Sequence, residues 1–396
     1  MVSGWIEGVV LLYFIYVAGY TFVFSFAAHF YRNPRAKSGK IHRFAVLIPA
    51  YKEDNVIISV ADNARKLNYD AASFRVVVIA DQLQKKTIDT LRALPVDVVE
   101  VSFEQSTKVK SLNKALHDIG DNFDYAVILD ADNIVLPDFL TLVNDVHNNG
   151  ARAVQGQRLP KNMDRNMAFL DGLSEAINNH IYRQGSSALG LSASISGSGV
   201  SFDYRLFKEL LSGMTSVGGF DRELEILLLK RGVKVVYCKN ARVLDEKVEK
   251  ANVFENQRKR WISSQYHYLG KYFKQGCLAL LRGNFTFFNS AVLRNIQLPR
   301  LINLGLMTIS AFLLYFIGDY LFFGYLIWPL LLGIMALSML IAIPREFFSR
   351  KLLKAILQLP EMFFRMFLLL FRLGEANKKF IHTPHGSSID KQGTSK

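Results

Sequence analysis

The sequence contains little cysteine and comparatively few acidic residues, and both shortages narrow the choice of protein class. Its two cysteines, Cys238 and Cys277, do not make a disulfide framework or a zinc site, and they fit a reducing cytosolic location. Basic residues outnumber acidic ones by 48 to 34, which gives a formal net charge of +14. Three kinds of partner suit such a charge: nucleic acid, anionic lipid or an anionic small substrate.

Charge is nearly absent from two long stretches. Residues 8–28 are uncharged and long enough to cross a bilayer as a helix, which takes about 20 apolar residues. A cleaved signal peptide is the alternative, but the run is too long and no Lys or Arg precedes it. Residues 301–343 carry one charge, Asp319, and suit two spans joined by a turn at 318–320. Basic residues such as Arg32 and Arg35 follow the first stretch, so the positive-inside rule places residue 32 onward in the cytoplasm. Arg294 and Arg300 precede the second stretch and Arg345 follows it, so the same rule returns both of its flanks to the cytoplasm.

The C-terminal part is apolar but interrupted. Residues 351–372 contain several charges, and a charge in the middle of a span is costly, so we expect a helix lying in the membrane interface. A fourth span is the alternative. Residues 386–396 are rich in Ser, Gly and Lys and are expected to be disordered. The sequence therefore predicts an integral, multi-pass protein of an inner or plasma membrane that contacts membrane lipid and keeps its main domain in the cytosol.

The middle of the chain alternates apolar strands with helical patterns. Strand-like runs occupy residues 44–49, 75–80, 96–101 and 125–129. The alternation predicts an α/β fold with a Rossmann-like, mostly parallel sheet and right-handed crossovers. Carboxylates follow three of these runs: Glu53 or Asp54, then Asp81, then Asp130 with Asp132. Because ligands gather at the carboxyl ends of parallel strands, we expect these acids to face one crevice.

Asp130 and Asp132 stand one residue apart where the run 125–129 stops, with Asn133 beside them. Two carboxylates next to an amide suit a hard divalent cation that also binds phosphate oxygens. The alternative is an acidic turn that holds no ligand. The motifs further along the chain decide between the two.

Three later segments carry further chemistry. Residues 194–199 form a small-residue loop in which glycine lets a ligand approach the backbone, but the Gly-Lys-Ser/Thr ending of a phosphate-binding loop is missing. Residues 217–225 read as a tight turn that enters a helix and carries Asp221 and Glu223. Residues 257–261 read Gln-Arg-Lys-Arg-Trp.

With these motifs in this order, the sequence resembles the family 2 glycosyltransferases of GT-A fold, of the membrane-bound type that includes cellulose and hyaluronan synthases. The resemblance covers residues 44–265 and, more loosely, the membrane segments. It implies a nucleotide-sugar donor, with UDP as the nucleotide, and Mg²⁺ or Mn²⁺ bound by Asp130 and Asp132. The donor-binding residues that it implies are Pro49, Tyr51, Glu53, Asp81, Lys108, Asp130, Gln257 and Arg260. The acceptor-binding residues that it implies are Ser196, Gly197, Ser198 and Trp261.

The catalytic base is where the sequence departs from this family. Asp221 aligns with the aspartate of the Glu-Asp motif, but Phe220 replaces the preceding Glu, and Glu223 follows closely enough to be the alternative base. Gln257, Arg260 and Trp261 match the motif Gln-x-x-Arg-Trp, which is associated with processive synthases. Residues 380–386 resemble a gating loop, with Phe380, Thr383 and His385 at its matching positions and His385 where Lys is usual.

Each of these residues also has a structural interpretation. Asp81 could cap the next helix, Lys108 could be a solvated helix start, and Asp221 could be an ordinary turn acid. Residues 258–260 could rest on anionic lipid, and Trp261 could be a membrane-interface anchor.

We expect an inverting transferase that moves a sugar from a UDP-sugar to a growing polysaccharide at the cytosolic membrane face and forms a β-linkage. One alternative is a single transfer onto a polyprenyl-linked acceptor. Three spans are few for a polymer channel, which favours a homo-oligomer, an export partner or non-processive action. A basic membrane-tethered scaffold or nucleic-acid-binding protein is a remote alternative, because no platform of aromatic and basic residues is present and we expect no nucleic acid as partner.

These interpretations divide the chain into six segments. They are an N-terminal transmembrane helix (1–31), a cytosolic GT-A domain (32–275), an interfacial segment (276–300), a transmembrane hairpin (301–343), an interfacial helix with a gating-loop-like segment (344–385) and a disordered tail (386–396).

Overall fold

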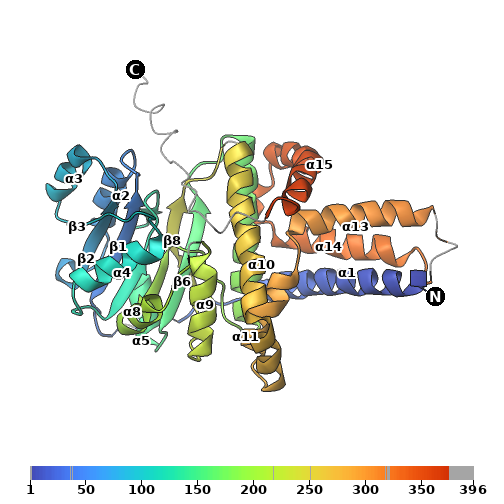
Figure 1. Ribbon diagram of the computed structural model, residues 1–396, viewed down its shortest axis with the longest axis horizontal. Helices are drawn as coiled ribbons and strands as arrows, with labels where there is room; N and C mark the ends of the chain where they lie inside the picture. The colour runs from blue at the N-terminus through green and yellow to red at the C-terminus, as the bar shows by residue number, and fades with distance from the viewer. Residues whose placement is uncertain are drawn as a thin grey trace.

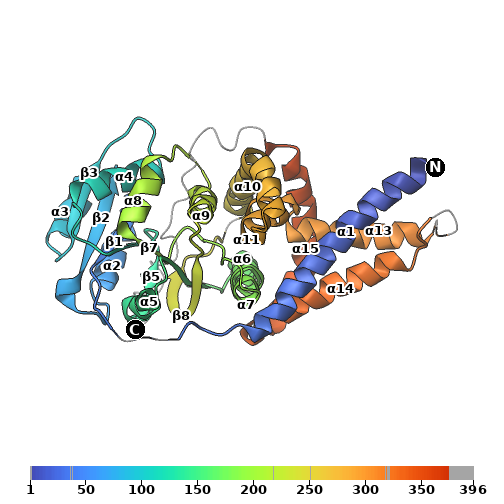
Figure 2. The ribbon, with the colours of Figure 1, turned by 90° about the horizontal axis from the view of Figure 1, so that it is seen from below.

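The computed structural model describes residues 2–373 except 36, 38, 217, 250, 317 and 319–321. A sheet with helices on both faces forms one end, and a bundle of apolar helices projects from the other (Figure 1). The long helix α10 (Ala251–Leu281) lies between these two parts in both views (Figure 2). This helix continues across residue 275, where the sequence places the end of the cytosolic domain.

The first half of the sheet follows the predicted pattern. Parallel strands lie in the order β3-β2-β1-β4. Their bounds are β1 (Phe44–Tyr51), β2 (Phe74–Asp81), β3 (Asp97–Val101) and β4 (Tyr125–Ile128). The helices between them are α2 (Ile57–Ala64), α3 (Lys85–Arg92) and α4 (Lys108–Asp118). The apolar runs of the sequence thus locate these strands correctly.

The second half of the sheet is mixed, so the prediction of a mostly parallel sheet is correct only in part. It contains β5 (Ile134–Val135), β6 (Ala153–Pro160), β7 (Val200–Asp203) and β8 (Val236–Asp245). β7 runs antiparallel to β4 and β6, and β5 runs antiparallel to β8. β5 and β7 are too short to give a periodic signal in the sequence. An irregularity in the pairing of β6 with β8 interrupts the apolar pattern of β8, which therefore looks like two separate pieces.

Each face of the sheet packs on its own helices, because successive side chains of a strand point to opposite faces. On one face, Leu47 and its neighbours pack against α4, α8 (Tyr204–Ser212) and α9 (Phe220–Lys230). On the other face, Val46 and Ile48 pack against α2 and α5 (Phe139–Asn148). Helix α5 thus covers one face of the sheet.

Two helical segments contain π-helical turns. The first consists of α6 (Asn166–Asn178), the π-helical η3 (Asn179–Gly185) and α7 (Ser186–Ala188). The second segment is α11 (Phe285–Phe288), the π-helical η4 (Asn289–Leu293) and α12 (Arg294–Ile296). The short 3₁₀ turns are η1 (Ala28–Phe30), η2 (Ala71–Ser73) and η6 (Arg345–Phe347).

The projecting bundle consists of α1 (Val2–Ala27), α13 (Arg300–Tyr315) and α14 (Ile327–Ala342). Among the described residues, one helical segment, Gly4–Phe30, is by itself long and apolar enough to cross a membrane. The pair Phe285–Ile296 and Arg300–Tyr315 passes the same test together but bends by 56°, and α14 is shorter. One membrane-spanning helix is thus supported by length and composition, and the predicted multi-pass arrangement is not established.

The bundle is joined tightly to the helices beside the sheet. Gly185 lies against the main chain of α1, so that a Cβ placed there would come within 2.2 Å of the Phe24 carbonyl oxygen. Only glycine permits this close approach of two backbones. The last helix, α15 (Arg350–Leu370), packs against α6, α10 and α13 and confirms the helix predicted at 351–372.

Candidate active site

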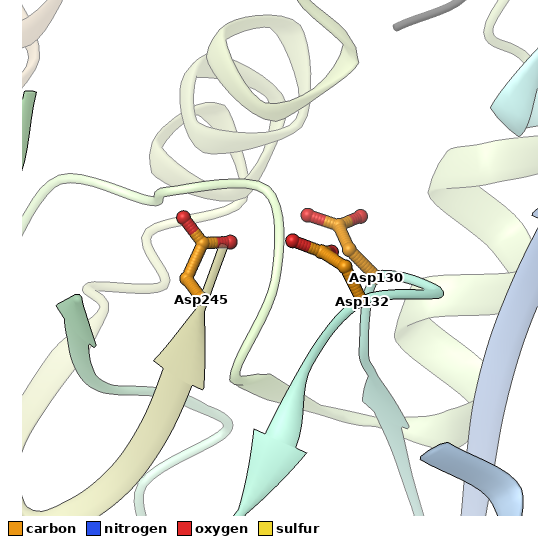
Figure 3. Close-up of side chains that lie close together, drawn as sticks. All are labelled: Asp130, Asp132 and Asp245. Carbon is orange, nitrogen blue, oxygen red and sulfur yellow. The ribbon is translucent and has the colours of Figure 1, made fainter. Parts of the chain in front are cut away.

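Three aspartates from two strand ends converge at one edge of the sheet. Asp130 and Asp132 lie in the turn that follows β4, and Asp245 is the last residue of β8. Their carboxyl groups point toward one another (Figure 3), and one oxygen from each lies within 4.8 Å of the others. Carboxylate oxygens are the ligands that Mg²⁺ and Mn²⁺ prefer, so this group has the chemistry to hold such an ion.

Hydrogen bonds orient these acids. Lys108 Nζ lies 2.5 Å from Asp130 Oδ1 and 2.9 Å from the carbonyl oxygen of Gly197. Asp132 Oδ2 accepts a hydrogen bond from the backbone N–H of Glu246 at 3.1 Å. Because Lys108 bridges the first acid and the small-residue loop, it holds these two parts of the site together.

Asp245 was missed by the sequence reasoning. It is buried and forms ion pairs with Arg158 at 2.5 Å and Lys247 at 2.7 Å. Burial alone would raise its pKa, but the two cations outweigh burial and lower it, which keeps the carboxylate ionised. The available signal was the alternation of buried Ala241, Val243 and Asp245, a strand that ends in an acid like the others.

Asp81 ends β2 on the same edge of the sheet. Its carboxylate accepts hydrogen bonds from Ser106 Oγ at 3.0 Å and Ser111 Oγ at 3.3 Å. Burial raises the pKa of Asp81. Neighbouring Lys52 has a positive φ of 56° and donates its backbone N–H to the Asp81 carbonyl oxygen, so the bend after β1 is fixed against β2.

One cavity of about 890 Å³ connects most of the predicted residues. Those that line it are Pro49, Tyr51, Glu53, Asp81, Lys108, Asp130, Asp132, Ser196, Gly197, Asp221, Gln257, Arg260 and Trp261. Ser198 is fully buried and does not line the cavity, and neither does Glu223. Phe380, Thr383 and His385 lie outside the residues that the structure describes.

The two candidate bases have different surroundings. Asp221 lies in the first turn of α9 and lines the cavity opposite Gly197, whose φ of +82° turns the loop there. Glu223 is buried on another side of the helix, where it pairs with Lys271 at 2.5 Å and accepts a hydrogen bond from Tyr268 at 3.3 Å. Asp221, and not Glu223, therefore lines the cavity that the three aspartates also line.

The Gln-x-x-Arg-Trp segment lies on α10 and faces the cavity. The guanidinium of Arg258 pairs with Asp171 at 2.6 Å and lies 4.4 Å from the ring centre of Trp261. Trp261 is 38% exposed, so part of its ring is open to a ligand while Arg258 covers another part. Burial lowers the pKa of Arg260.

Sequence reasoning also missed the arginines at the far end of the cavity. Arg294 and Arg300 were interpreted only as positive flanks of a membrane segment, yet both line the cavity together with Arg222. Arg294 pairs with the buried Glu225 at 2.7 Å. Nothing in the local sequence reveals this convergence, because the three residues come from separate helices.

Comparison with known proteins gives one family and one fold. Residues 42–264, more than half of the chain, match the family model described as "Glycosyltransferase like family 2". No curated protein matches the sequence.

The fold is similar to that of a mannosyltransferase from Pyrobaculum calidifontis in complex with GDP-Man and Mn²⁺. The two share 16% sequence identity at a TM-score of 0.54, over 84% of this chain and 96% of that one. A glucosyl-3-phosphoglycerate synthase from Mycobacterium tuberculosis, in complex with Mn²⁺, UDP and phosphoglyceric acid, matches at 17% identity and a TM-score of 0.42. That match covers 58% of this chain and 82% of the synthase. The first of these structures supports a GT-A-like fold for this chain.

Proposed function

Because this chain belongs to glycosyltransferase family 2, we propose that it is an inverting, metal-dependent hexosyltransferase. It takes a sugar from a nucleotide-sugar donor and adds it to a growing saccharide at the cytosolic face of a membrane. The observation that carries this proposal is the convergence of Asp130, Asp132, Asp245 and Asp221 on one cavity.

The donor lies at the sheet end of the cavity in this proposal. We assign to Asp81 the binding of the base or the ribose, and Tyr51 and Glu53 line the same cavity. The mannosyltransferase of similar fold was solved with GDP-Man and Mn²⁺, which supports a nucleotide sugar here. UDP stays our expectation for the nucleotide, on the resemblance of the sequence alone.

The leaving diphosphate is handled by the three aspartates and Lys108. When bound by Asp130, Asp132 and Asp245, Mg²⁺ or Mn²⁺ would supply Lewis-acid stabilisation of the charge on the diphosphate. Lys108 places a further positive charge beside Asp130, where it can donate a hydrogen bond to a phosphate oxygen. Arg260 lines the same cavity and can do likewise.

Asp221 takes the proton in this scheme. The acceptor hydroxyl oxygen bonds to the anomeric carbon while the bond from that carbon to the phosphate oxygen breaks. The nucleoside diphosphate leaves with the electron pair, and the hydroxyl proton passes to the Asp221 carboxylate. A single displacement with one base inverts the configuration, so an α-linked donor gives a β-linkage.

We place the apolar bundle in the membrane. α1 is long and apolar enough to cross it, and many side chains of α13 and α14 that face away from the bundle interior are apolar and exposed, such as Phe312, Leu330 and Leu337. α15 would lie at the interface, with exposed Leu357 and Phe364 toward lipid. A multi-pass arrangement with α13 and α14 as spans, and a homo-oligomer or an export partner, belong to this proposal.

A single transfer onto a polyprenyl-linked acceptor is the second candidate. The specific observation in its favour is that the cavity continues past Asp221 into a region lined by apolar side chains of α13, α14 and α15. Product size separates the two candidates, because one added sugar per acceptor excludes a processive synthase.

A donor screen tests the proposed function. The purified full chain in detergent, with Mn²⁺ or Mg²⁺ and a panel of nucleotide sugars, should release nucleoside diphosphate from at least one donor. Asp132→Ala and Asp221→Asn should each abolish most of that release. Full turnover in both variants across the panel would contradict the proposal.

A further inference from the structure

The far end of the cavity contains more positive charge than its neighbours compensate. Arg222, Arg258, Arg294 and Arg300 come from α9, α10, α12 and α13, and all four line the cavity. Two of them are neutralised, since Arg258 pairs with Asp171 and Arg294 with Glu225. The other two have different surroundings.

Arg222 and Arg300 have no carboxylate within ion-pair distance in the described part of the chain. Arg222 donates to the side-chain oxygen of Asn295 at 2.7 Å. Arg300 donates to the carbonyl oxygen of Ser174 at 3.2 Å and lies 5.7 Å from the ring centre of Tyr182. Arg300 Nη1 is shielded from solvent and has no hydrogen-bond partner among the described residues.

A charged guanidinium without an ionic partner is destabilising in the buried lining of a protein. The free-energy cost of removing a cation from water is offset only by a nearby anion or by several hydrogen bonds. Burial and the neighbouring Arg294 lower the pKa of Arg222, which is the expected sign for a cation without enough compensation. Guanidinium groups bind phosphate oxygens in pairs of hydrogen bonds, so an anionic ligand would repay the cost.

Beyond Arg300 the cavity changes character. The residues that α13, α14 and α15 contribute to the lining after Arg300 are all apolar, with Leu304 on α13, Met339 on α14, and Leu352, Ala355 and Met362 on α15. Such a region favours a hydrocarbon chain and offers nothing to a sugar hydroxyl.

We propose that the acceptor is an amphiphilic lipid whose phosphate or diphosphate head binds between Arg222 and Arg300 and whose hydrocarbon chain fills the apolar region beyond them. This inference rests on the proposed function and names its acceptor class: the growing saccharide is attached to a lipid phosphate. Arg222 is the residue after Asp221, so this head group lies beside the base that receives the acceptor proton.

Binding of short probes tests this inference. The full chain in a neutral detergent is first saturated with UDP and Mn²⁺, so that the donor site is filled. Farnesyl phosphate, farnesol and inorganic phosphate are then compared by native mass spectrometry. Farnesyl phosphate should bind at least tenfold more tightly than either of the others, because it alone has both the anion and the chain.

Single substitutions then locate the head group. Arg300→Gln and Arg222→Gln should each weaken farnesyl phosphate binding about tenfold and leave UDP binding unchanged. Arg300→Lys keeps the charge and should retain most of the binding. Arg205→Gln is the matched control, since Arg205 is exposed on α8 away from the cavity. A merely structural arginine would lower the melting temperature on substitution without changing the preference for farnesyl phosphate over farnesol.

Three outcomes would overturn the inference: equal binding of farnesol and farnesyl phosphate, unchanged binding in both glutamine variants, or displacement of farnesyl phosphate by a soluble polyuronate fragment. The last result would assign the arginines to an acidic saccharide. If UDP binds with Mn²⁺ and farnesyl phosphate does not, this inference alone fails. If no nucleoside diphosphate from the donor panel binds with Mn²⁺, the proposed function fails as well.

Discussion

The two ends of the cavity differ in whether their charged side chains have ionic partners. At the sheet end, Asp130 and Asp245 each have a cation within about 3 Å, and these partners are part of the fold. At the helix end, Arg222 and Arg300 have only neutral oxygen partners among the described residues. The sheet end is therefore organised before any ligand arrives, whereas the helix end is left to be completed by one.

This difference follows from the elements that build each end. Strand ends are held in register by backbone hydrogen bonds, so acids that follow them have fixed positions. The arginines come from helices that pack through apolar side chains, and their positions depend on that packing. Substitutions at the sheet end should therefore affect the chemical step, and substitutions at the helix end should affect acceptor binding.

The largest effect is expected from Asp132→Asn. Loss of this carboxylate weakens a metal ion at the point where charge develops, and nucleoside diphosphate release should fall about a thousandfold. The rate of release at saturating donor and Mn²⁺ measures it. Asp89→Asn, on the exposed surface of α3, is the control and should keep the rate of the unaltered protein. A rate within threefold in Asp132→Asn would show that the acids do not hold the ion.

Asp221→Asn should follow, with turnover reduced several hundredfold, because an amide cannot accept the hydroxyl proton. The donor KM should change little, since Asp221 is assigned to the acceptor proton. Steady-state kinetics with the donor that the screen identifies will measure both.

Glu223→Gln is the matched comparison for Asp221. It removes the charge by which the buried Glu223 pairs with the exposed Lys271, so the melting temperature should fall while turnover per folded molecule is kept. The reverse pattern, with turnover lost in Glu223→Gln and kept in Asp221→Asn, would exchange their roles.

The paired charges near the sheet end should be visible in the pH dependence of stability. Burial would raise the pKa of Glu175, but Arg183, Lys247 and Arg158 outweigh it and lower the pKa from 4.5 to about 2. A depressed pKa stabilises the fold above the unfolded value, and this contribution is lost as the pH falls from about 4.5 toward 2. The loss is on the order of 3 kcal/mol. Urea unfolding between pH 6 and 3 checks it, and the slope below pH 4.5 should be shallower in Glu175→Gln.

The smallest effect is expected at Trp261. Trp261→Leu removes an aromatic face that is partly covered by Arg258 and should raise the acceptor KM about fivefold. The acceptor KM of Trp261→Phe should lie between the values of the unaltered protein and of Trp261→Leu. An unchanged acceptor KM would assign Trp261 to packing on Arg258 alone.

The sequence predicts the sheet end well for a physical reason. Buried parallel strands need continuous apolar runs, and a carboxylate directly after such a run is visible without any structure. Asp245 could not be recognised in this way, because the irregular pairing of β8 with β6 interrupts the apolar run that precedes it. The four residues of β7 are too few for a period, so the antiparallel part of the sheet was missed.

The helix end could not be predicted from sequence in the same way. Arg294 and Arg300 stand beside an apolar stretch, where a basic residue ordinarily marks the cytoplasmic side of a span. Their inward position depends on the bend between α12 and α13 and on contacts with distant helices. Only the folded chain shows that they share a cavity with Asp221.

The close contact between Gly185 and the Phe24 carbonyl bears on how far the candidate active site lies from the apolar bundle. The main chain of α1 lies directly against the main chain of a helical segment beside the sheet, with no side chain between them, so this contact couples the position of the candidate active site to that of the apolar helices. In the proposed function, each transfer would then take place at a similar distance from the membrane. An acceptor that enters from the apolar side would need a head group long enough to span that distance.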